Sequence, residues 1–315
     1  MRRLRRLWEK LIEGAIRVSG VAAIVFVALI LGFLLKDALP VLRTTTLGEL
    51  LVGHEWRPTA TEPQFGFLPL ILGSLLVTVG ALAIAIPLSV ACATFLAEVA
   101  PRGVRDLVKP VVELLAAIPS VVFGFVGLVV IGTALQKAAV STSEAVPGPE
   151  WLKAALNMPT GMAAITGALM LALMTLPTIV TISEDALAAV PRSYREGSLA
   201  LGATRWQTIV GVTLPAAKSG IIAAVMLGIG RAVGETMTVL MVTGNAPVIP
   251  SLTSGLFRPV RTMTATIAAE MGETAHQTPH YHALFMLGVL LLLTTFAVNT
   301  AADVVMRRGK HVERR

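Results

Sequence analysis

An arginine and a glutamate lie inside one of the most apolar stretches of this chain. The stretch reads GIGRAVGETMTVLMVTG, residues 228–244, and it carries Arg231 and Glu235. Glu235 follows Arg231 by four residues, which places both charges on one face of a helix, one turn apart. A guanidinium offers paired N–H donors that match two oxygens of a phosphate group. One function that the pair indicates is therefore a place on the path of an anion.

The depth of Arg231 makes its charge costly. A helix that begins near Ser219 brings Arg231 about 18 Å along its axis, close to the middle of a bilayer. An arginine at that depth costs about 2.5–3.5 kcal/mol on insertion scales, so we expect it to face a cavity, a partner or a ligand rather than lipid. The alternative is a neutralised pair that joins helices, although a pair at this spacing contributes only about 0.2–0.5 kcal/mol. The residues alone leave both interpretations open.

The composition of the chain is that of a membrane protein. Its 315 residues are 55% hydrophobic and 14% charged, with a mean hydropathy of +0.76, whereas soluble domains are about 25% charged. Six apolar runs are long enough to cross a hydrocarbon core of about 30 Å as helices, and none alternates as a barrel strand does. We therefore predict an all-α membrane protein with six transmembrane helices. The runs are residues 18–39, 68–96, 109–135, 161–183, 219–244 and 283–305.

The basic residues are distributed by topology rather than gathered for a nucleic acid. With the N-terminus in the cytoplasm, 18 of the 26 Lys and Arg residues fall in inside segments and 7 in outside segments, and Arg231 lies within the fifth span. This asymmetry follows the positive-inside rule. We expect a multi-pass protein of the plasma (inner) membrane, surrounded by lipid, with both termini cytoplasmic and no nucleic acid partner. The single cysteine, Cys92, excludes an intrachain disulfide.

No change of composition divides the chain into separate globular domains. Residues 1–17 have apolar positions at helical spacing with basic residues opposite, which predicts an amphipathic helix on the cytoplasmic leaflet; a simple cluster of topogenic charges is the alternative. Residues 18–67 form the first transmembrane helix and an extracytoplasmic loop, and residues 68–306 a core of five transmembrane helices. Within that core, residues 184–217 form a polar cytoplasmic loop, and residues 307–315 are a basic cytoplasmic tail.

Motifs for catalysis are absent from the sequence. It has no G-x-x-x-x-G-K-[ST] phosphate loop, no H-E-x-x-H metal motif and no G-x-S-x-G nucleophile elbow. The three histidines of AHQTPHYH, His276, His280 and His282, fit no standard metal spacing, so we predict no metal site. We expect a protein that is not an enzyme and that binds no cofactor of its own.

The cytoplasmic loop predicts a docking element. Helix-forming residues run from Tyr194 to Leu201, and Gly202 then acts as a stop signal. A short helix that exposes Arg192, Arg195 and Glu196 on the cytoplasmic face is suited to contact another protein, whereas a plain connecting loop is the alternative.

The spacing of this loop resembles that of the permease subunits of ABC importers, E-A-A-x3-G-x9-I-x-L-P. This chain has Glu196, Gly197 and Ser198, then Gly202 after three residues, and Leu214-Pro215 at the end of the motif. The small residues at 197 and 198 are expected to permit close helix packing. The resemblance implies the type I (MetI-like) permease fold and a coupling helix that fits a cleft of a separate ATPase. ATP and Mg²⁺ would then bind to that partner.

Within this family the chain is similar to the phosphate-specific PstC permeases over most of its length. The similarity lies in four blocks: EWRPTATEPQFGFLPLILGSLL, FLAEVAPRGVRDLVKPVVELLAAIPSVVFGFVGL, GRAVGETMTVLMVTGN and TATIAAEMGETAHQTPHYHALF. It implies that Arg231 and Glu235 belong to a phosphate path. It also implies three kinds of partner: a second, PstA-like permease, a PstB-like ATPase homodimer and a PstS-like extracytoplasmic phosphate-binding protein.

Three alternatives remain open at this point. In the first, the chain is a permease of the same kind of ABC importer, but the substrate is another oxyanion, such as sulfate, molybdate or phosphonate. One arginine does not distinguish these tetrahedral anions from phosphate. In the second, the chain is the partner phosphate permease, PstA, which shares the coupling loop. In a different class, it would be an ATPase-independent anion channel or a membrane scaffold, which the spacing of the coupling loop disfavours.

Overall fold

The computed structural model describes residues 2–145, 158–251 and 255–312 of the chain. These residues are mostly helical, and β1 pairs antiparallel with β2 in a small hairpin. The elements are, in chain order, α1 (Arg2–Ala38), the 3₁₀ helix η1 (Leu39–Arg43), α2 (Leu47–Val52), β1 (Trp56–Arg57), β2 (Gln64–Phe65), α3 (Leu68–Thr94), the π-helical turn η2 (Phe95–Val99), α4 (Arg102–Ala117), α5 (Ser120–Val126), the π-helical turn η3 (Gly127–Ile131), α6 (Gly132–Ala145), α8 (Ala164–Ala188), α9 (Arg192–Ala200), α10 (Arg205–Thr208), the π-helical turn η4 (Ile209–Thr213), α11 (Leu214–Ala216), α12 (Lys218–Gly234), α13 (Met237–Val242), the 3₁₀ helix η5 (Gly255–Phe257), α14 (Met263–Glu270) and α15 (Pro279–Val312).

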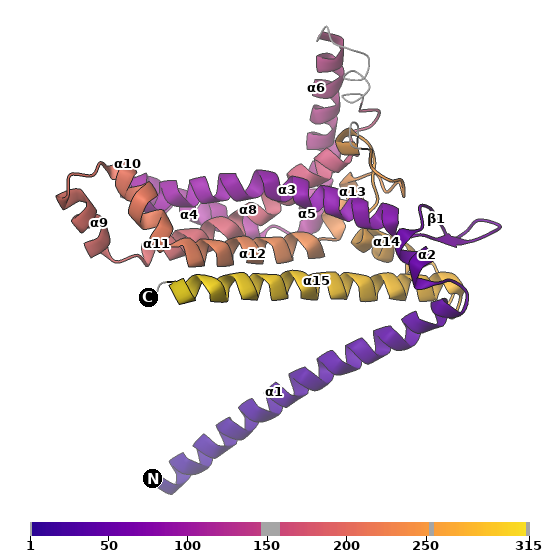
Figure 1. The fold of residues 1–315 in the computed structure, drawn as a ribbon, viewed down its shortest axis with the longest axis horizontal. Coiled ribbons are helices and arrows are strands. Elements are labelled where there is room, and N and C mark those ends of the chain that lie inside the picture. The colour runs from indigo at the N-terminus through magenta and orange to yellow at the C-terminus, as the bar shows by residue number, and fades with distance from the viewer. Residues whose placement is uncertain (1, 146–157, 252–254, 313–315) are drawn as a thin grey trace.

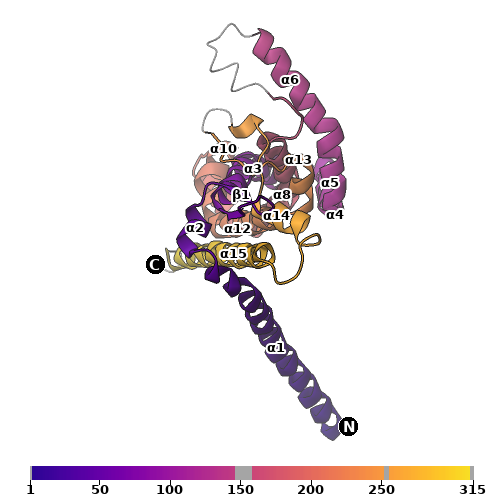
Figure 2. The same cartoon turned by 90° about the vertical axis from the view of Figure 1, so that its right-hand side faces the viewer.

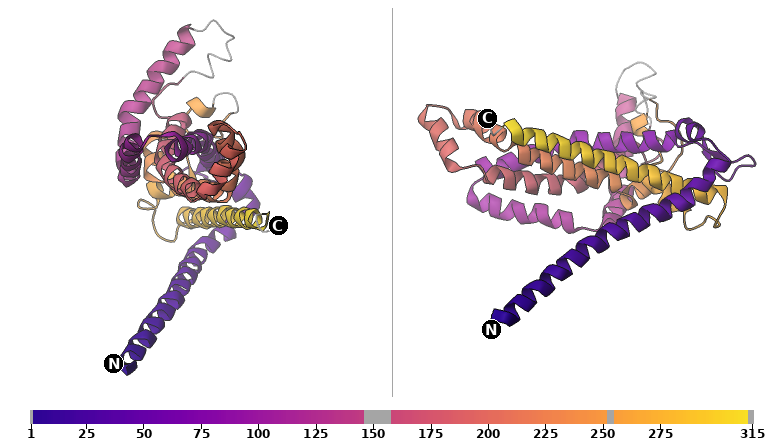
Figure 3. Two further views of the ribbon diagram at one scale, coloured as in Figure 1. Left: turned by 90° about the vertical axis from the view of Figure 1, so that its left-hand side faces the viewer. Right: turned by 60° about the horizontal axis from the view of Figure 1, so that its bottom comes forward.

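A bundle of four long helices, α3, α8, α12 and α15, forms the centre of the fold (Figures 1 and 3). The most apolar part of α8 is 61% buried, against 22% for α3 and 28% for α15. Helix α8 is therefore the central element, and α3, α4 and α12 all pack on it.

Small residues bring α3 and α8 close together. One face of α3 buries a residue at every fourth position: Gly73, Val77, Ala81, Ala85, Ser89 and Ala93. A Cβ atom added at Gly80 would lie 3.1 Å from Ala168 Cβ in α8, and the hydroxyl of Ser89 donates to the carbonyl of Leu176 at 3.3 Å. Small residues at such spacing let helix backbones approach in a membrane, where van der Waals contact and hydrogen bonds drive association.

Two helices extend away from this bundle. Helix α1 diverges from it, and α6 projects from its other side (Figures 1 and 2). None of the most apolar window of α1 is buried, although Phe33, near the end of α1, makes an edge-to-face contact with Phe285 at 5.7 Å. Helix α1 runs without interruption through residue 17, so no structural break separates the predicted amphipathic segment from the first span.

The predicted all-α membrane fold agrees with the structure. In the described residues, five helices are long and apolar enough to cross a membrane, and the pair Arg205–Ala216 and Lys218–Gly234, bent by 68°, makes a sixth. The predicted third span, 109–135, is wrong in its boundaries. Helix α4 ends at Ala117, and the apolar span begins afresh at Ser120. Pro119 accounts for the break, because proline disfavours helical geometry at the residue before it, and Ile118 is extended with ψ 128°.

The fifth span also differs from its prediction over 219–244. Helix α12 ends at Gly234, and the separate helix α13 begins at Met237. The intervening Glu235 is extended, with ψ 130°. The sequence pattern missed this break because the residues on both sides of it are apolar and continue the hydrophobic run.

We expect replacement of Gly73 by alanine to destabilise the fold. The added methyl group would lie 2.2 Å from the carbonyl oxygen of Arg261, so α3 would have to move away from that backbone. Overpacking of this kind costs about 1–3 kcal/mol, and a lower Tm of the purified protein in detergent would report it. Gly32→Ala is the matched control, because no atom lies within 4 Å of its added methyl. Equal Tm values for Gly73→Ala and the unmodified protein would contradict this packing.

Candidate functional site

Arg231 lies in the last turn of α12 with its side chain exposed. Its Nη1 donates to Oγ1 of Thr178 in α8 at 3.2 Å, and this is its one partner in the part of the chain that the structure describes. A positive charge is favourable at the C-terminus of a helix, where the backbone dipole ends in partial negative charge. A guanidinium has five N–H donors, so most of those of Arg231 are open to a ligand or a partner.

Glu235 is not placed as the sequence predicted. It lies beyond the end of α12, so it is not one turn further along the same helical face, and its Oε1 accepts from the backbone N of Thr238 at 3.0 Å. No ion pair joins it to Arg231 within the residues that the structure describes. The alternative interpretation, a neutralised pair that joins helices, therefore does not fit this conformation. Glu235 instead holds the first turn of α13.

The break between α12 and α13 is held by threonine hydroxyls. Thr264 of α14 donates to the carbonyl of Glu235 at 2.9 Å, and Thr236 donates to the carbonyl of Gly234 at 3.2 Å. Thr238 donates to the carbonyl of Ser120 at the start of α5, at 2.9 Å. An unpaired carbonyl costs several kcal/mol in a membrane interior, so these bonds allow non-helical backbone there. Discontinuous helices of this kind form substrate sites in membrane transporters.

The polar loop over residues 184–217 contains the predicted short helix and its stop. Helix α9 ends at Ala200, and Gly202 adopts a left-handed conformation with φ +86°. The backbone N of Gly202 donates to Leu199 O, and that of Ala203 donates to Ser198 O. These two bonds form a Schellman motif, which favours glycine because a side chain is strained at that φ. The predicted stop at Gly202 is confirmed, and Leu214 and Pro215 of the same motif begin α11.

An exposed apolar surface on and beside α9 was not predicted. Helix α9 has no buried residue, and Leu201 and Trp206 are 90% and 67% exposed. Tyr194 and Leu199 on α9 are also exposed. Large apolar side chains within an otherwise polar loop were a signal in the sequence that went unused. We call these four residues, Tyr194, Leu199, Leu201 and Trp206, the α9 surface. They offer an exposed apolar area of the kind that another protein covers.

The residues of the predicted coupling loop have different environments. Arg192 and Glu196 are exposed, as predicted. Arg195 is not, because it turns inward and bonds to Glu98, so its prediction as an exposed docking residue is wrong. A Cβ atom at Gly197 would meet nothing within 4 Å, so no close packing inside this chain requires a small residue there. Ser198 does pack closely, and its Oγ lies 3.0 Å from Oγ1 of Thr208.

Ionic contacts tie α4 to the same end of α8. Glu184 of α8 is 1% exposed and is paired with Arg105 and, at 2.5 Å, with Lys109. The hydrogen bond to Glu184 raises the pKa of Lys109. The lysine is therefore charged at neutral pH. The stability that this ion pair contributes is fully present at any pH below the ordinary pKa of lysine, and it is lost only as the pH rises through the raised pKa of the folded protein. This network explains why α4 lies along α8 although the second half of α4 falls within the predicted third apolar run, residues 109–135.

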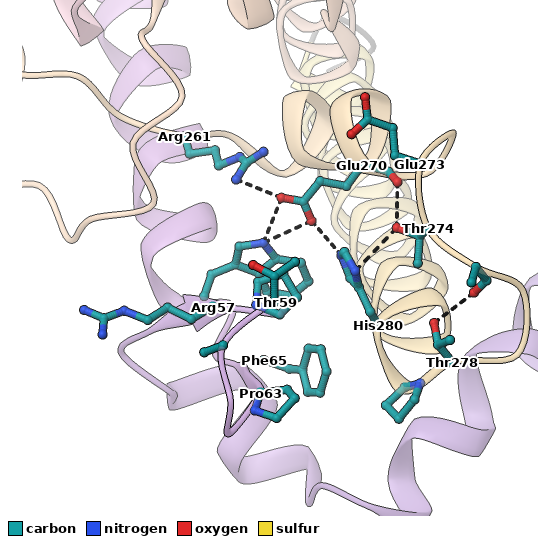
Figure 4. A pocket seen from close by; sticks show the side chains of 15 residues that line it. Arg57, Thr59, Pro63, Phe65, Arg261, Glu270, Glu273, Thr274, Thr278 and His280 are labelled. Atoms are coloured by element: carbon teal, nitrogen blue, oxygen red, sulfur yellow. Dashed lines mark hydrogen bonds and ion pairs between the residues drawn. The ribbon is translucent and has the colours of Figure 1, made fainter.

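A second polar cluster lies beside the β-hairpin (Figure 4), at the end of the bundle opposite to α9 (Figure 1). Glu270 of α14 accepts from Trp56 Nε1 at 3.2 Å, from Arg261 Nη1 at 2.8 Å, and lies 2.8 Å from His280 Nε2. These groups form one wall of an open cavity of about 710 Å³. The carboxylate is already satisfied by three neighbours, so the cluster anchors the hairpin to α14 and α15 and leaves no free group of Glu270 for a ligand.

The three histidines of the AHQTPHYH segment have separate partners. His280 contacts Glu270, the Nδ1 of His282 lies 2.6 Å from the carbonyl oxygen of Asp37, and His276 packs edge-on against Tyr281 at 5.1 Å. The structure therefore does not bring them together as ligands of one ion.

The family of the chain follows from comparison with known proteins. The family described as "Binding-protein-dependent transport system inner membrane component" matches residues 85–311. The chain belongs to this family. The matched region includes the break at Glu235, α9 and the central helices α8 and α12, and therefore both regions that were predicted to be functional.

Relatives of this permease are membrane transport subunits. It is 38% identical to the probable ABC transporter permease protein YqgH of Bacillus subtilis over 94% of this chain and 89% of that protein. It is 37% identical to the phosphate transport system permease protein PstC of Mesorhizobium japonicum, over 82% of this chain and 78% of that one. For PstC 1 of Mycobacterium tuberculosis the identity is 37%, over 78% and 73% of the two chains. The chain is thus a permease subunit and not an enzyme.

Solved structures agree with this fold. A chain of the MetNI methionine ABC transporter in an inward-facing conformation superposes with a TM-score of 0.51, covering 78% of this permease and 94% of that chain, at 18% identity. A chain of a bacterial ABC transporter that imports the acidic polysaccharide alginate gives 0.53, covering 77% and 79%, also at 18% identity. The type I importer permease fold that the resemblance implied is thereby confirmed.

We expect Glu270→Gln to loosen the hairpin. The change removes the charge that compensates Arg261, whose side chain is only 15% exposed, and loss of one partner of a buried pair costs about 3–5 kcal/mol. Limited proteolysis should cut between β1 and β2 faster, and the Tm should fall. Glu273→Gln is the matched control, because that exposed carboxylate has no side-chain partner among the described residues. Equal cleavage rates for the two variants would contradict the anchoring role.

Proposed function

We propose that this permease is one of two transmembrane subunits of an ATP-driven importer of inorganic phosphate. The observation that carries the proposal is Arg231, whose donors are open beside a break in a membrane helix. Geometry and chemistry both suit an oxyanion, because a guanidinium binds two phosphate oxygens at once. The phosphate transport permeases among its relatives support phosphate as the substrate.

We place the α9 end of the bundle in the cytoplasm. The start of α1 and the end of α15 lie toward that end, together with α9, and the hairpin lies at the opposite end (Figures 1 and 3). This arrangement agrees with the charge asymmetry of the sequence and the positive-inside rule. A separate ATPase homodimer then docks on the α9 surface, and a phosphate-binding protein delivers its ligand at the hairpin end.

A second permease completes the path in this proposal. Arg231 is exposed in the isolated chain, and the apolar windows of α1 and of the span Ser120–Ser143 are mostly unburied. A charged side chain near the middle of a membrane must face protein, ligand or water. A partner of similar fold supplies the opposite wall and removes Arg231 from lipid.

Glu235 acts in this proposal through its position in the chain rather than by pairing with Arg231. In this conformation Thr178, rather than Glu235, holds the arginine, and the bond is to a neutral hydroxyl. A single neutral bond is easily exchanged for a passing anion, and weak binding favours release. Glu235 acts indirectly, because it fixes the start of α13 at the break where the arginine lies.

Other tetrahedral oxyanions remain the nearest alternative substrates. A guanidinium alone does not separate phosphate from sulfate, molybdate or phosphonate, so uptake of labelled phosphate in competition with each anion decides between them. An ATPase-independent channel is disfavoured by α9, whose capped helix and apolar surface suit a docking partner.

We expect Arg231→Gln to reduce phosphate uptake by the reconstituted importer by about 10- to 150-fold. This range corresponds to the loss of about 1.5–3 kcal/mol for a hydrogen bond to a charged group. Uptake of labelled phosphate into proteoliposomes gives the measurement, at equal amounts of assembled complex. Arg102→Gln is the control, because that exposed arginine of α4 has no side-chain partner among the described residues. Uptake near that of the unmodified importer in Arg231→Gln would refute the path assignment.

Two substitutions test the docking of α9. Gly202→Asp places a side chain at φ +86° and should disturb the end of α9, whereas Glu196→Lys reverses an exposed charge without strain. Both should reduce co-purification of the ATPase and ATP-driven uptake. Gly103→Ala, where an added methyl meets nothing, is the control. Normal recruitment and normal transport in both variants would count against the ATPase as the partner of α9.

A further inference from the structure

Arg195 belongs to the coupling helix but directs its whole guanidinium toward the bundle. Its Nε and Nη2 donate to the carboxylate of Glu98, with the shortest contact at 2.5 Å. Its Nη1 donates to the carbonyl of Val190 at 2.7 Å, and Nη2 also donates to that of Leu187 at 2.9 Å. All three nitrogens of the group are therefore engaged inside the chain. None remains in position to serve an ATPase.

The acceptors of Arg195 belong to the ends of two bundle helices. Leu187 is in the last turn of α8, and Val190 lies two residues beyond the end of this helix. Carbonyls at the C-terminus of a helix favour a cation. Glu98 is in η2, the π-helical turn that ends α3, and its side chain is 9% exposed. A carboxylate so enclosed needs a charged partner, and Arg195 supplies it. One side chain thus joins α9 to α3 and to α8.

Helix α9 also packs against η4 and α10, but in the described residues it has no other ion pair with the bundle. It buries no residue, and its other side-chain hydrogen bond, from Ser198, reaches only Thr208 of α10. A displacement of α9 would therefore pass to α3 and α8 chiefly through Arg195 and the connecting backbone, whereas η4 provides a separate contact toward α12. The receiving helix α8 also holds Thr178, the partner of Arg231.

We propose that Arg195 and Glu98 are positioning residues that transmit movement of α9 to α3 and α8. The proposal rests on the proposed function, because it requires an ATPase that moves α9. Helix α3 is held to α8 along the small-residue stripe, so the pair moves as a unit when Arg195 moves. That movement would shift Thr178 relative to Arg231 and so alter the site at the helix break.

The decisive measurement is the amount of phosphate moved per ATP hydrolysed. The complete importer, with its second permease, ATPase and phosphate-binding protein, is reconstituted with Glu98→Gln or with Arg195→Lys. Glutamine lacks the negative charge of Glu98. Lysine keeps the positive charge of Arg195 but lacks the planar guanidinium that reaches Glu98 and both carbonyls at once. We expect the ATPase to co-purify normally and the transport ratio to fall roughly tenfold, within the ~5- to 150-fold range typical of coupling between sites.

Two controls separate transmission from a general loss of structure. Glu13→Gln removes an exposed glutamate that is paired with Arg17 at 2.6 Å, and it should leave the ratio unchanged. Glu98→Asp keeps the carboxylate and should recover part of the ratio. A merely structural role would lower Tm without this recovery pattern.

Three results would overturn the proposal. The first is an unchanged ratio in both Glu98→Gln and Arg195→Lys. The second is loss of the ATPase from both complexes, which would make the contact a requirement for docking. The third is a fall in Tm that parallels the fall in the amount of phosphate moved per ATP. Failure of the proposed function would look different, because the unmodified complex itself would then transport without a requirement for ATP.

Discussion

A helix in a membrane gains little from burying apolar side chains against another helix, because lipid is equally apolar. The contact between α3 and α8 therefore depends on close approach, and residues as small as Gly80, Ala81 and Ala85 provide it on α3. Helix α12 reaches α8 in the same way, since an added Cβ at Gly228 would lie 2.6 Å from Ile179. Every functional feature then depends on α8. Its cytoplasm-facing end in the proposed orientation holds Arg195 and α4, and its middle holds Thr178.

The second constraint is that no backbone polar group is left unpaired in an apolar medium. The chain breaks a membrane helix at Glu235, and hydroxyls of Thr236, Thr238 and Thr264 pair with carbonyls around the break. The cost of interrupting the helix is thereby reduced, and Arg231 is brought to a helix terminus where its charge is favourable. An unbroken helix would place the same arginine among intact turns, with no partial negative charge beside it.

The sequence predicted those features that depend on interactions between residues close together in the chain. Hydrophobic runs predicted the number of spans, and Gly202 predicted the end of α9 because a left-handed residue is required there. The break at Glu235 was missed because its support comes from Thr264, far along the chain. The inward turn of Arg195 was missed for the same reason, since Glu98 lies 97 residues away. The sequence shows the residue types of both pairs, Thr264 with Glu235 and Arg195 with Glu98, but it does not show that the members of each pair are in contact.

The structure also explains why a site with one exposed arginine is compatible with a membrane. Arg231 alone would be costly against lipid, and the apolar faces of α1 and of the span Ser120–Ser143 are similarly uncovered. In the proposed assembly a second permease covers both kinds of surface at once. The charge then faces a path between two subunits, so the transport site is a property of the pair. Because α8 connects this site to Arg195 and α9, a displacement applied at one end of the bundle has a continuous packed route to the other.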